Sequence, residues 1–295
     1  MLPGITGHLF SESFLEQHLA DNPSVISPLE RRELLMWRTT CASLGPASAI
    51  RTLVEVGAAP LVRALGFAGL ERIEITTDSS AATITGPTPP LTLIVVRWGE
   101  RLDPLWRLAF QESHQRTASW CLLFNGTHVR LIETQRGYSR RYVEFDLDTT
   151  LDHDRTLAVL WTLIGARALD STTVRSRQSL TLLAESERYA AGVSRSLKDG
   201  VLSASGSVLN ALIKRRSVDV RPAAFEQALT IVYRVLFLLF AEARGLAPLW
   251  HPVYRESYSM AAMRDAAEHE RSSAGLWDAL RAVDPRTRQD RVRVG

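Results

Sequence analysis

Asp78, Val95 and Arg97 stand where a metal-dependent nuclease would need its catalytic residues. Such a site takes an aspartate from one strand, then a glutamate and a lysine, two positions apart, from the next central strand. The two carboxylates hold a divalent ion, and the lysine orients or activates the attacking water. Valine in place of the glutamate cannot bind a hard cation, and arginine in place of the lysine stays protonated. The pattern predicts a degenerate site with no catalytic residue and no metal, where Asp78 serves in a turn and Arg97 is structural or contacts phosphate.

Further polar residues follow the central strand. Gln111 and Gln115 lie on the next predicted helix, where nuclease folds sometimes place a substrate-orienting glutamine, and both also suit an exposed helix surface. Glu100 and Asp103 could bind a metal, although Asp103 more simply caps the helix that begins at Pro104. An active nuclease stays open as an alternative, with the candidate ligands Glu74, Asp78, Glu100 and Asp103.

The basic side chains are almost all arginines, and the net charge of +3 permits nucleic-acid binding without requiring it. One basic cluster flanks a predicted hairpin strand. Another lies at a helix end, where cations are also favoured for purely structural reasons. The candidate DNA-binding residues, which we expect to contact phosphates, are Arg97, Arg136, Arg140, Arg141, Lys214, Arg215, Arg216 and Arg221.

Several motifs of other enzyme classes are missing from the sequence. It contains no phosphate-binding loop and no dinucleotide-binding glycine pattern, and its histidines lack metal-ligand spacing. The segment 88–91, Thr-Pro-Pro-Leu, lacks the amide or acidic first residue and the aromatic last residue of an adenine methyltransferase loop. Methyl transfer therefore cannot be assigned to these residues.

The elements that must position these residues follow from hydrophobic periodicity. Ser27 and Glu30 predict a capping box at the start of a helix over 28–43, and a second helix follows over 47–65. Asn125-Gly126 predicts a hairpin. The predicted strands cover 73–77, 82–85, 91–98, 120–124, 128–133 and a last stretch at 142–147, with a helix over 103–115. After residue 148 only helices are predicted, over 151–169, 179–192, 194–215, 222–245, 260–270 and 274–283.

Composition is that of a globular protein, with 45% hydrophobic and 23% charged residues. The first ten residues lack the features of a signal peptide. The most apolar stretch, 228–241, is interrupted by Arg234 and is shorter than the ~20 residues that span a bilayer. We therefore expect a cytoplasmic protein without a membrane partner.

Three stretches together resemble a known family. They are residues 7–15 (GHLFSESFL), the hairpin at 120–131 beginning WCLLFNG, and residues 233–246 (YRVLFLLFAEARGL), in which Glu242, Arg244 and Gly245 form a structural motif at a helix end. Residues 254–259 (YRESYS) and 276–280 (LWDAL) continue the likeness. In this order, the stretches are similar to the N-terminal region of type IIG restriction–modification enzymes and related large adenine-N6 DNA methyltransferases of phage-defence type.

The resemblance implies functions that lie mostly outside these residues. A methyltransferase domain would follow beyond residue 295, binding S-adenosylmethionine and flipping adenine from the duplex. No cofactor is expected within this segment. The implied partners are double-stranded DNA, the methyltransferase domain and other subunits of a defence system.

The predicted fold is α+β. It comprises a nuclease-like mixed sheet with helices, a degenerate version of the PD-(D/E)xK fold, followed by an all-helical module. The predicted divisions are an N-terminal arm at 1–26, the nuclease-like domain at 27–149 and a helical connector at 150–295. A DNA-contacting scaffold is the favoured function. The active nuclease and a protein-interaction module of a defence complex stay open as alternatives.

Overall fold

The computed structural model describes residues 2–20, 26–86, 90–135, 140–169, 178–215 and 221–268, together with 275, 278 and 280. The chain divides into two compact units, residues 1–193 and 194–295. The division falls within the long helix α9 (Gln178–Arg215). The sequence had predicted two helices here, over 179–192 and 194–215, with Gly192 at the end of the first. A glycine inside a helix costs only about 1 kcal/mol, and α9 continues through it.

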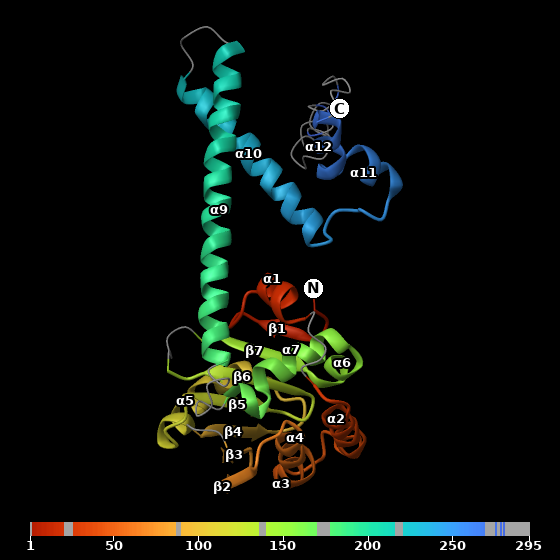
Figure 1. Cartoon of the computed structure of the whole chain (residues 1–295), viewed down its shortest axis with the longest axis vertical. Helices are drawn as coiled ribbons and strands as arrows, with labels where there is room; N and C mark the ends of the chain where they lie inside the picture. Colours follow the sequence, from red (N-terminus) through yellow and green to blue (C-terminus); the bar gives the residue numbers. More distant parts are fainter. Residues whose placement is uncertain are drawn as a thin grey trace, which may run out of the picture. The chain divides into compact units, whose positions relative to one another are not determined.

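The first unit has an α+β fold built on a seven-stranded mixed sheet (Figure 1). Its strands are β1 (Ile5–Gly7), β2 (Gly69–Ile75), β3 (Ser79–Thr85), β4 (Leu91–Val96), β5 (Trp120–Phe124), β6 (His128–Glu133) and β7 (Tyr142–Asp146). They lie in the order β1-β7-β6-β5-β4-β3-β2. All neighbours are antiparallel except β4 and β5, which are parallel and joined by helix α5 (Trp106–Gln115). The predicted succession of strands, one helix and more strands is confirmed.

Alternating side chains of the central strands build a core on each face of the sheet. Leu93 and Val95 enter the larger core, while Ile94 and Val96 enter the smaller one, which α5 covers. Besides α5 and the first part of α9, the helical elements of this unit are α1 (Glu12–Phe14), a π-helical turn (Leu15–Leu19), α2 (Pro28–Cys41), α3 (Ile50–Thr52), a π-helical segment (Leu53–Ala58), α4 (Ala59–Ala64), a 3-10 turn (Asp103–Leu105), α6 (Leu147–Asp152), α7 (Asp154–Ile164) and α8 (Ala166–Leu169). The capping box that begins α2 is confirmed, because the backbone N–H of Ser27 donates to Glu30 at 2.7 Å and the N–H of Glu30 donates to the Ser27 hydroxyl at 3.3 Å.

The N-terminal segment is part of the sheet unit, whereas the sequence had predicted an arm over 1–26. β1 pairs with β7, and Leu9, Phe10 and Phe14 are buried in the larger core. Gly7 permits this pairing because a Cβ there would lie 2.3 Å from the carbonyl oxygen of Tyr142. A short strand that pairs with a partner about 140 residues away leaves little periodic signal in the sequence.

Helices α6, α7 and α8 also belong to the first unit. Leu157, Leu160 and Leu163 of α7 are buried in the larger core. The sequence had placed the boundary at 149/150, where strands give way to helices. The structure divides the chain at 193/194, because these helices pack on the sheet instead of on one another alone.

The second unit contains the rest of α9 together with α10 (Arg221–Ala243), α11 (Pro252–Ser257) and α12 (Met260–Glu268). Gly245 ends α10 in the left-handed region, with φ +68°. Its N–H donates to the backbone carbonyl of Glu242, and the N–H of Leu246 donates to the backbone carbonyl of Ala241. This is the Schellman arrangement. Glu242 accepts hydrogen bonds from the Tyr254 hydroxyl at 3.0 Å and from the N–H of Met260 at 2.9 Å. The predicted motif at residues 242–245 thus connects α10 to the segment 254–260.

Tyr254 gives this connection a pH dependence. Burial, followed by the hydrogen bond to Glu242 and its negative charge, raises the pKa of Tyr254 from 10.0 to about 12. A raised pKa contributes stability that is fully present below the unfolded value and lost as pH rises towards the folded one. We therefore expect the thermal stability of the native chain to fall between about pH 10 and 12, and to fall less in Tyr254→Phe. Tyr233→Phe, at an exposed position on α10, is the matched control, and an equal fall in both variants would contradict the assignment.

One described helix segment, Ala224–Ala243, has 20 residues and a mean hydropathy of 1.6. Of its most apolar 18-residue stretch, 28% is buried. By length and composition alone it could cross a membrane, and it includes the shorter apolar stretch at 228–241 that the sequence had identified. Core helices of soluble proteins meet the same criterion, so a single such helix is weak evidence for a membrane protein.

Candidate functional site at the carboxyl ends of the central strands

The register of the sheet brings Asp78 and Arg97 together. Ser79 at the start of β3 pairs with Val96 at the end of β4, so the residues just outside these positions are neighbours. The guanidinium of Arg97 donates to the Asp78 carboxylate and forms an ion pair, and both side chains are mostly exposed. The carboxylate that would be the first metal ligand is therefore already paired with a cation.

Val95 lies inside the larger core and is 1% exposed. It is two positions before Arg97, so it stands where the second carboxylate of a nuclease would be. A carboxylate at this position would be desolvated among apolar side chains, at a high cost in free energy. The local geometry thus offers one exposed carboxylate beside an arginine in place of a pair of carboxylates.

The turn of the β5–β6 hairpin holds the segment after β4. The N–H of Gly99 donates to the Asn125 carbonyl at 2.9 Å, and the Asn125 side-chain amide donates to the Glu100 carbonyl at 2.8 Å. Gly126, with φ +89°, lies against the ring of Trp98. The predicted Asn-Gly hairpin therefore also fixes the residues that follow Arg97.

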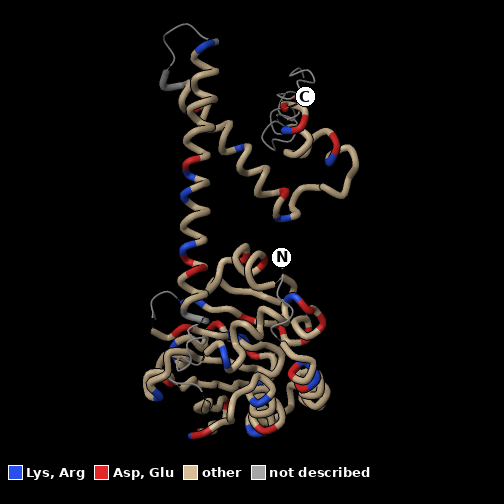
Figure 2. Tube along the Cα trace, viewed as in Figure 1, with Lys and Arg blue, Asp and Glu red and all other residues tan. Residues whose placement is uncertain are grey.

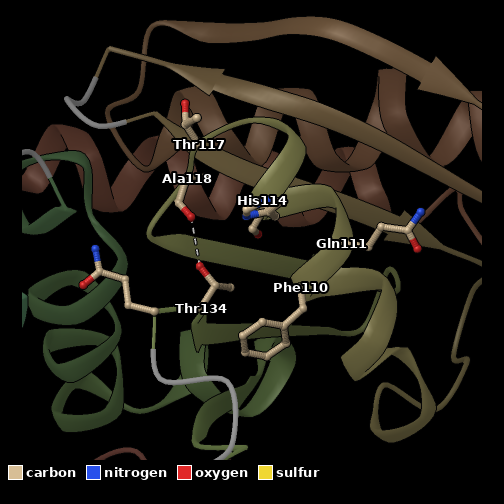
Figure 3. Close-up of a pocket in the computed structure, with 8 residues that line it drawn as sticks. Phe110, Gln111, His114, Thr117, Ala118 and Thr134 are labelled. Atoms are coloured by element: carbon tan, nitrogen blue, oxygen red, sulfur yellow. Dashed lines mark hydrogen bonds between the residues drawn. The ribbon is translucent and has the colours of Figure 1, made fainter.

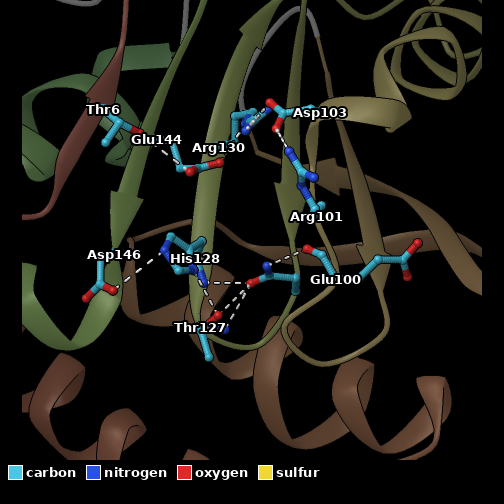
Figure 4. Close-up of polar contacts among 10 residues, drawn as sticks. Thr6, Glu100, Arg101, Asp103, Thr127, His128, Arg130, Glu144 and Asp146 are labelled. Atoms are coloured by element: carbon cyan, nitrogen blue, oxygen red, sulfur yellow. Dashed lines mark hydrogen bonds and ion pairs between the residues drawn. The ribbon is translucent and has the colours of Figure 1, made fainter. Parts of the chain in front are cut away.

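Arg130 forms a second polar cluster near this end of the sheet, on β6 (Figure 4). Its side chain is 5% exposed and donates to Glu144 at 2.6 Å and to Asp103 at 3.0 Å. Its guanidinium also lies 3.9 Å from the ring centroid of Tyr142. The sequence interpretation missed Arg130, and the predicted capping role of Asp103 is wrong, because Asp103 makes no capping hydrogen bond and pairs with Arg130 instead.

His128 lies between a hydroxyl and a carboxylate in the same region. Its Nδ1 is 2.8 Å from the Thr127 hydroxyl, and its Nε2 is 3.6 Å from Asp146. Such a set can activate a nucleophile. Here the groups have structural partners, because the Thr127 hydroxyl also bonds to Asn125 at 3.1 Å and Asp146 caps α6 through the N–H of Thr149.

Three of the four candidate carboxylates of the alternative metal site pair with different arginines, and the fourth, that of Glu100, accepts a hydrogen bond from the backbone N–H of Arg97 at 3.3 Å. Glu74 pairs with the buried Arg116 at 3.0 Å, Asp78 pairs with Arg97, and Asp103 pairs with Arg130. Within the described residues, no group of three or more histidine, cysteine, aspartate or glutamate side chains could hold a metal ion.

The predicted DNA-binding residues do not form one surface. β7 runs in the same direction as β4, because β6 is antiparallel to both β5 and β7 while β4 and β5 are parallel. Arg97 follows the carboxyl end of β4, whereas Arg140 and Arg141 precede β7 and so lie at the opposite end of the sheet. Arg141 also pairs with Glu187 of α9.

Four of the remaining basic candidates lie at or after the end of α9 in the sequence: Lys214, Arg215, Arg216 and Arg221. Lys214 is exposed near its last turn. Arg136 and Arg216, and the side chains of Arg215 and Arg221, lie outside the described residues. Figure 2 shows basic and acidic residues interspersed in the described parts of both units.

Gln111 is also separate from the Asp78–Arg97 pair. It lines a depression at the carboxyl end of α5, with Ala118 just before β5 and Thr134 just after β6 (Figure 3). Gln115 is exposed at the end of α5 and is not among the residues that line the depression. The structure thus unites Asp78 and Arg97, and it places Gln111 elsewhere.

Comparisons with protein-family models, curated proteins and solved structures found no match to this chain. The structure by itself defines an α+β protein with a seven-stranded mixed sheet. Any more specific assignment depends on the residues described above and on the sequence resemblance.

Proposed function

We propose that the chain is the N-terminal, DNA-contacting and scaffolding part of a restriction–modification or phage-defence adenine-N6 DNA methyltransferase. Its nuclease-like sheet does not cleave DNA. The Asp78–Arg97 pair, next to the buried Val95, carries this proposal. An arginine in this place cannot act as a base, but it suits a phosphate group. S-adenosylmethionine would bind to the methyltransferase domain, outside these residues.

The order of elements supports the nuclease-like part of the proposal. A helical segment ending in α4 precedes three antiparallel strands, β2 to β4, and α5 then leads to β5, which is parallel to β4. The exposed carboxylate and the basic residue come from adjacent strands at the carboxyl end of β4, which is a common position for sites in sheets with parallel strands.

Two substitutions with different expected effects test the role of Arg97. Arg97→Ala removes the phosphate contact, and we expect duplex affinity to fall about fivefold at low salt. Asp78→Asn removes the carboxylate that competes for Arg97, so affinity should stay the same or rise. Fluorescence anisotropy with a labelled duplex measures both.

Arg63→Ala, at an exposed arginine in the last turn of α4, is the control for net charge. If Arg97→Ala and Arg63→Ala weaken binding equally, Arg97 makes no specific contact. If Asp78→Asn abolishes a magnesium-dependent cleavage of plasmid DNA by the native chain, the active-nuclease alternative is correct.

A second candidate function, a protein-interaction module, is favoured by α10. Its large side chains Phe225, Tyr233, Phe237 and Phe240 are each at least half exposed. Exposed aromatic side chains are typical of protein interfaces. This function predicts no salt-dependent duplex binding, so the anisotropy measurement separates the two candidates.

A further inference from the structure

Helix α10 carries a continuous stripe of exposed side chains, which we call the α10 seam. Its members lie alternately four and three positions apart along the chain, which is the spacing of a helix face that packs against another helix. They are Glu226, Thr230, Tyr233, Phe237, Phe240 and, one residue beyond the end of α10, Arg244. The three aromatic side chains at the centre of the seam are 67%, 58% and 53% exposed, in chain order. More than half of this apolar centre therefore faces solvent.

The opposite side of α10 is already used in packing. Ala228, Val232 and Leu238 are buried, and at 3.6 residues per turn they face away from the seam. A helix that lies on a membrane instead has a polar face rich in lysine and arginine opposite its apolar one. A seam backed by buried apolar side chains is therefore better suited to a protein partner than to a lipid surface.

The two ends of the seam carry opposite charges. Glu226 is exposed at one end, and at the other the guanidinium of Arg244 lies 5.7 Å from the ring centroid of Phe240. A second copy of α10 that runs antiparallel, about a two-fold axis at the middle of the seam, places Glu226 of each copy opposite Arg244 of the other. A parallel copy would place like charges against each other, which is unfavourable. The charges of the seam thus complement those of a second copy in the antiparallel direction.

The centre of the seam fits the same arrangement. The antiparallel copy places Tyr233 opposite Phe237 and Thr230 opposite Phe240, so rings meet rings, and aromatic pairs add to the benefit of burial. The Thr230 hydroxyl donates to the backbone carbonyl of Glu226 at 2.8 Å. Covering this hydroxyl therefore leaves no donor without a partner.

The size of the seam sets the expected strength of the contact. Aromatic side chains bury about 150–250 Å² each when they are covered fully, so the exposed parts of the three rings supply roughly 350 Å² per copy. Leu229 and Leu236 flank the seam and are only half-buried. With them, two copies would bury on the order of 1,000 Å² in total, at the low end of specific interfaces. A contact of this size predicts a weak dimer that depends on concentration.

We propose that two copies of this chain associate through the α10 seam as an antiparallel, two-fold symmetric pair. The aromatic rings pack at the centre, and Glu226 and Arg244 of different copies pair at both ends. The inference goes beyond the proposed function and does not depend on it, since the pair forms whether or not the chain contacts DNA.

Sedimentation equilibrium of the full chain without DNA tests this inference. We expect a monomer–dimer equilibrium with a Kd in the micromolar range. Phe237→Glu places a carboxylate among the rings and should weaken dimerisation about tenfold or more. Phe225→Glu is the matched control, because Phe225 is on the same helix and 50% exposed, but points about 100° away from the seam. It should leave the Kd unchanged, and circular dichroism checks that both variants keep the native fold.

Charge substitutions test the antiparallel direction. Glu226→Arg should weaken dimerisation about threefold or more, because it places two arginines together at each end of the pair. Combining it with Arg244→Glu restores opposite charges and should recover most of the affinity. A dimer that is unaffected by Glu226→Arg would contradict the antiparallel arrangement.

The inference is overturned if the native chain stays monomeric throughout the micromolar range. It is also overturned if Phe225→Glu and Phe237→Glu weaken dimerisation equally, since association then reflects apolar surface in general. A chain that stays monomeric but sediments with vesicles of phosphatidylcholine and phosphatidylglycerol, and loses this binding in Phe237→Glu, would identify a lipid surface as the partner of the seam.

Discussion

Gly126→Ala is expected to destabilise the first unit by about 3 kcal/mol. Two costs add here. The residue has φ +89°, which is strained for any side chain by roughly 1–2 kcal/mol, and the added Cβ would lie 2.2 Å from the ring of Trp98. Overpacking of this kind costs about 1–3 kcal/mol. Because Trp98 follows Arg97, its displacement should also disturb the Asp78–Arg97 pair. Urea unfolding monitored by circular dichroism measures the stability.

Gly99→Ala separates the two costs. Gly99 also has positive φ, at +67°, but a Cβ there would meet no atom within 4 Å. It should therefore show the backbone strain alone, about 1–2 kcal/mol. Equal losses for the two variants would mean that the contact between Gly126 and Trp98 does not determine the packing of this turn.

Arg130→Met is expected to lower the free energy of unfolding by about 3–5 kcal/mol. The reason is that Glu144, whose side chain is only 15% exposed, would lose the cation with which it pairs. Arg101→Met is the control. Arg101 lies 3.8 Å from the carboxylate of Asp103, which also pairs with Arg130, but the Arg101 side chain is 87% exposed. The loss in free energy of unfolding should therefore stay below about 1 kcal/mol. Both are measured by the shift of the urea midpoint.

A double substitution, Arg130→Met with Glu144→Leu, tests the reason for this cost. Removing both members of a buried ion pair can be nearly neutral, so the double variant should recover more than half of the stability lost in Arg130→Met. If it is as unstable as the single variant or less stable, packing of the arginine stem and its contact with Tyr142 explain the loss better than the uncompensated charge.

The sequence was sufficient to predict the central part of the sheet. The apolar run of β4, the Asn-Gly hairpin between β5 and β6, and the capping box of α2 are local signals, and all three are present in the structure. β1 was missed because its pairing with β7 is long-range. The predicted domain boundary differed from the structural one because the sequence of an amphipathic helix does not indicate which element its apolar face packs against.

Only part of the candidate site could be predicted in the same way. Asp78 and Arg97 were chosen by residue type, but their contact depends on the register of β3 on β4, which spacing alone does not fix. Arg130, Glu144 and Asp103 come from three separate segments, so no local sequence motif predicts that they interact. Gln111 was assigned to the nuclease-like site by its helix, yet it lines the depression near Ser113.

The dependence of duplex affinity on salt concentration tests the central claim most directly. A chain that contacts DNA through its arginines displaces counterions from the phosphates, so its affinity should fall about tenfold or more as salt rises from roughly 50 to 200 mM. Arg97→Ala should show a shallower dependence than the native chain. An affinity that does not change with salt, or no duplex binding at the lowest salt, would contradict a DNA-contacting scaffold.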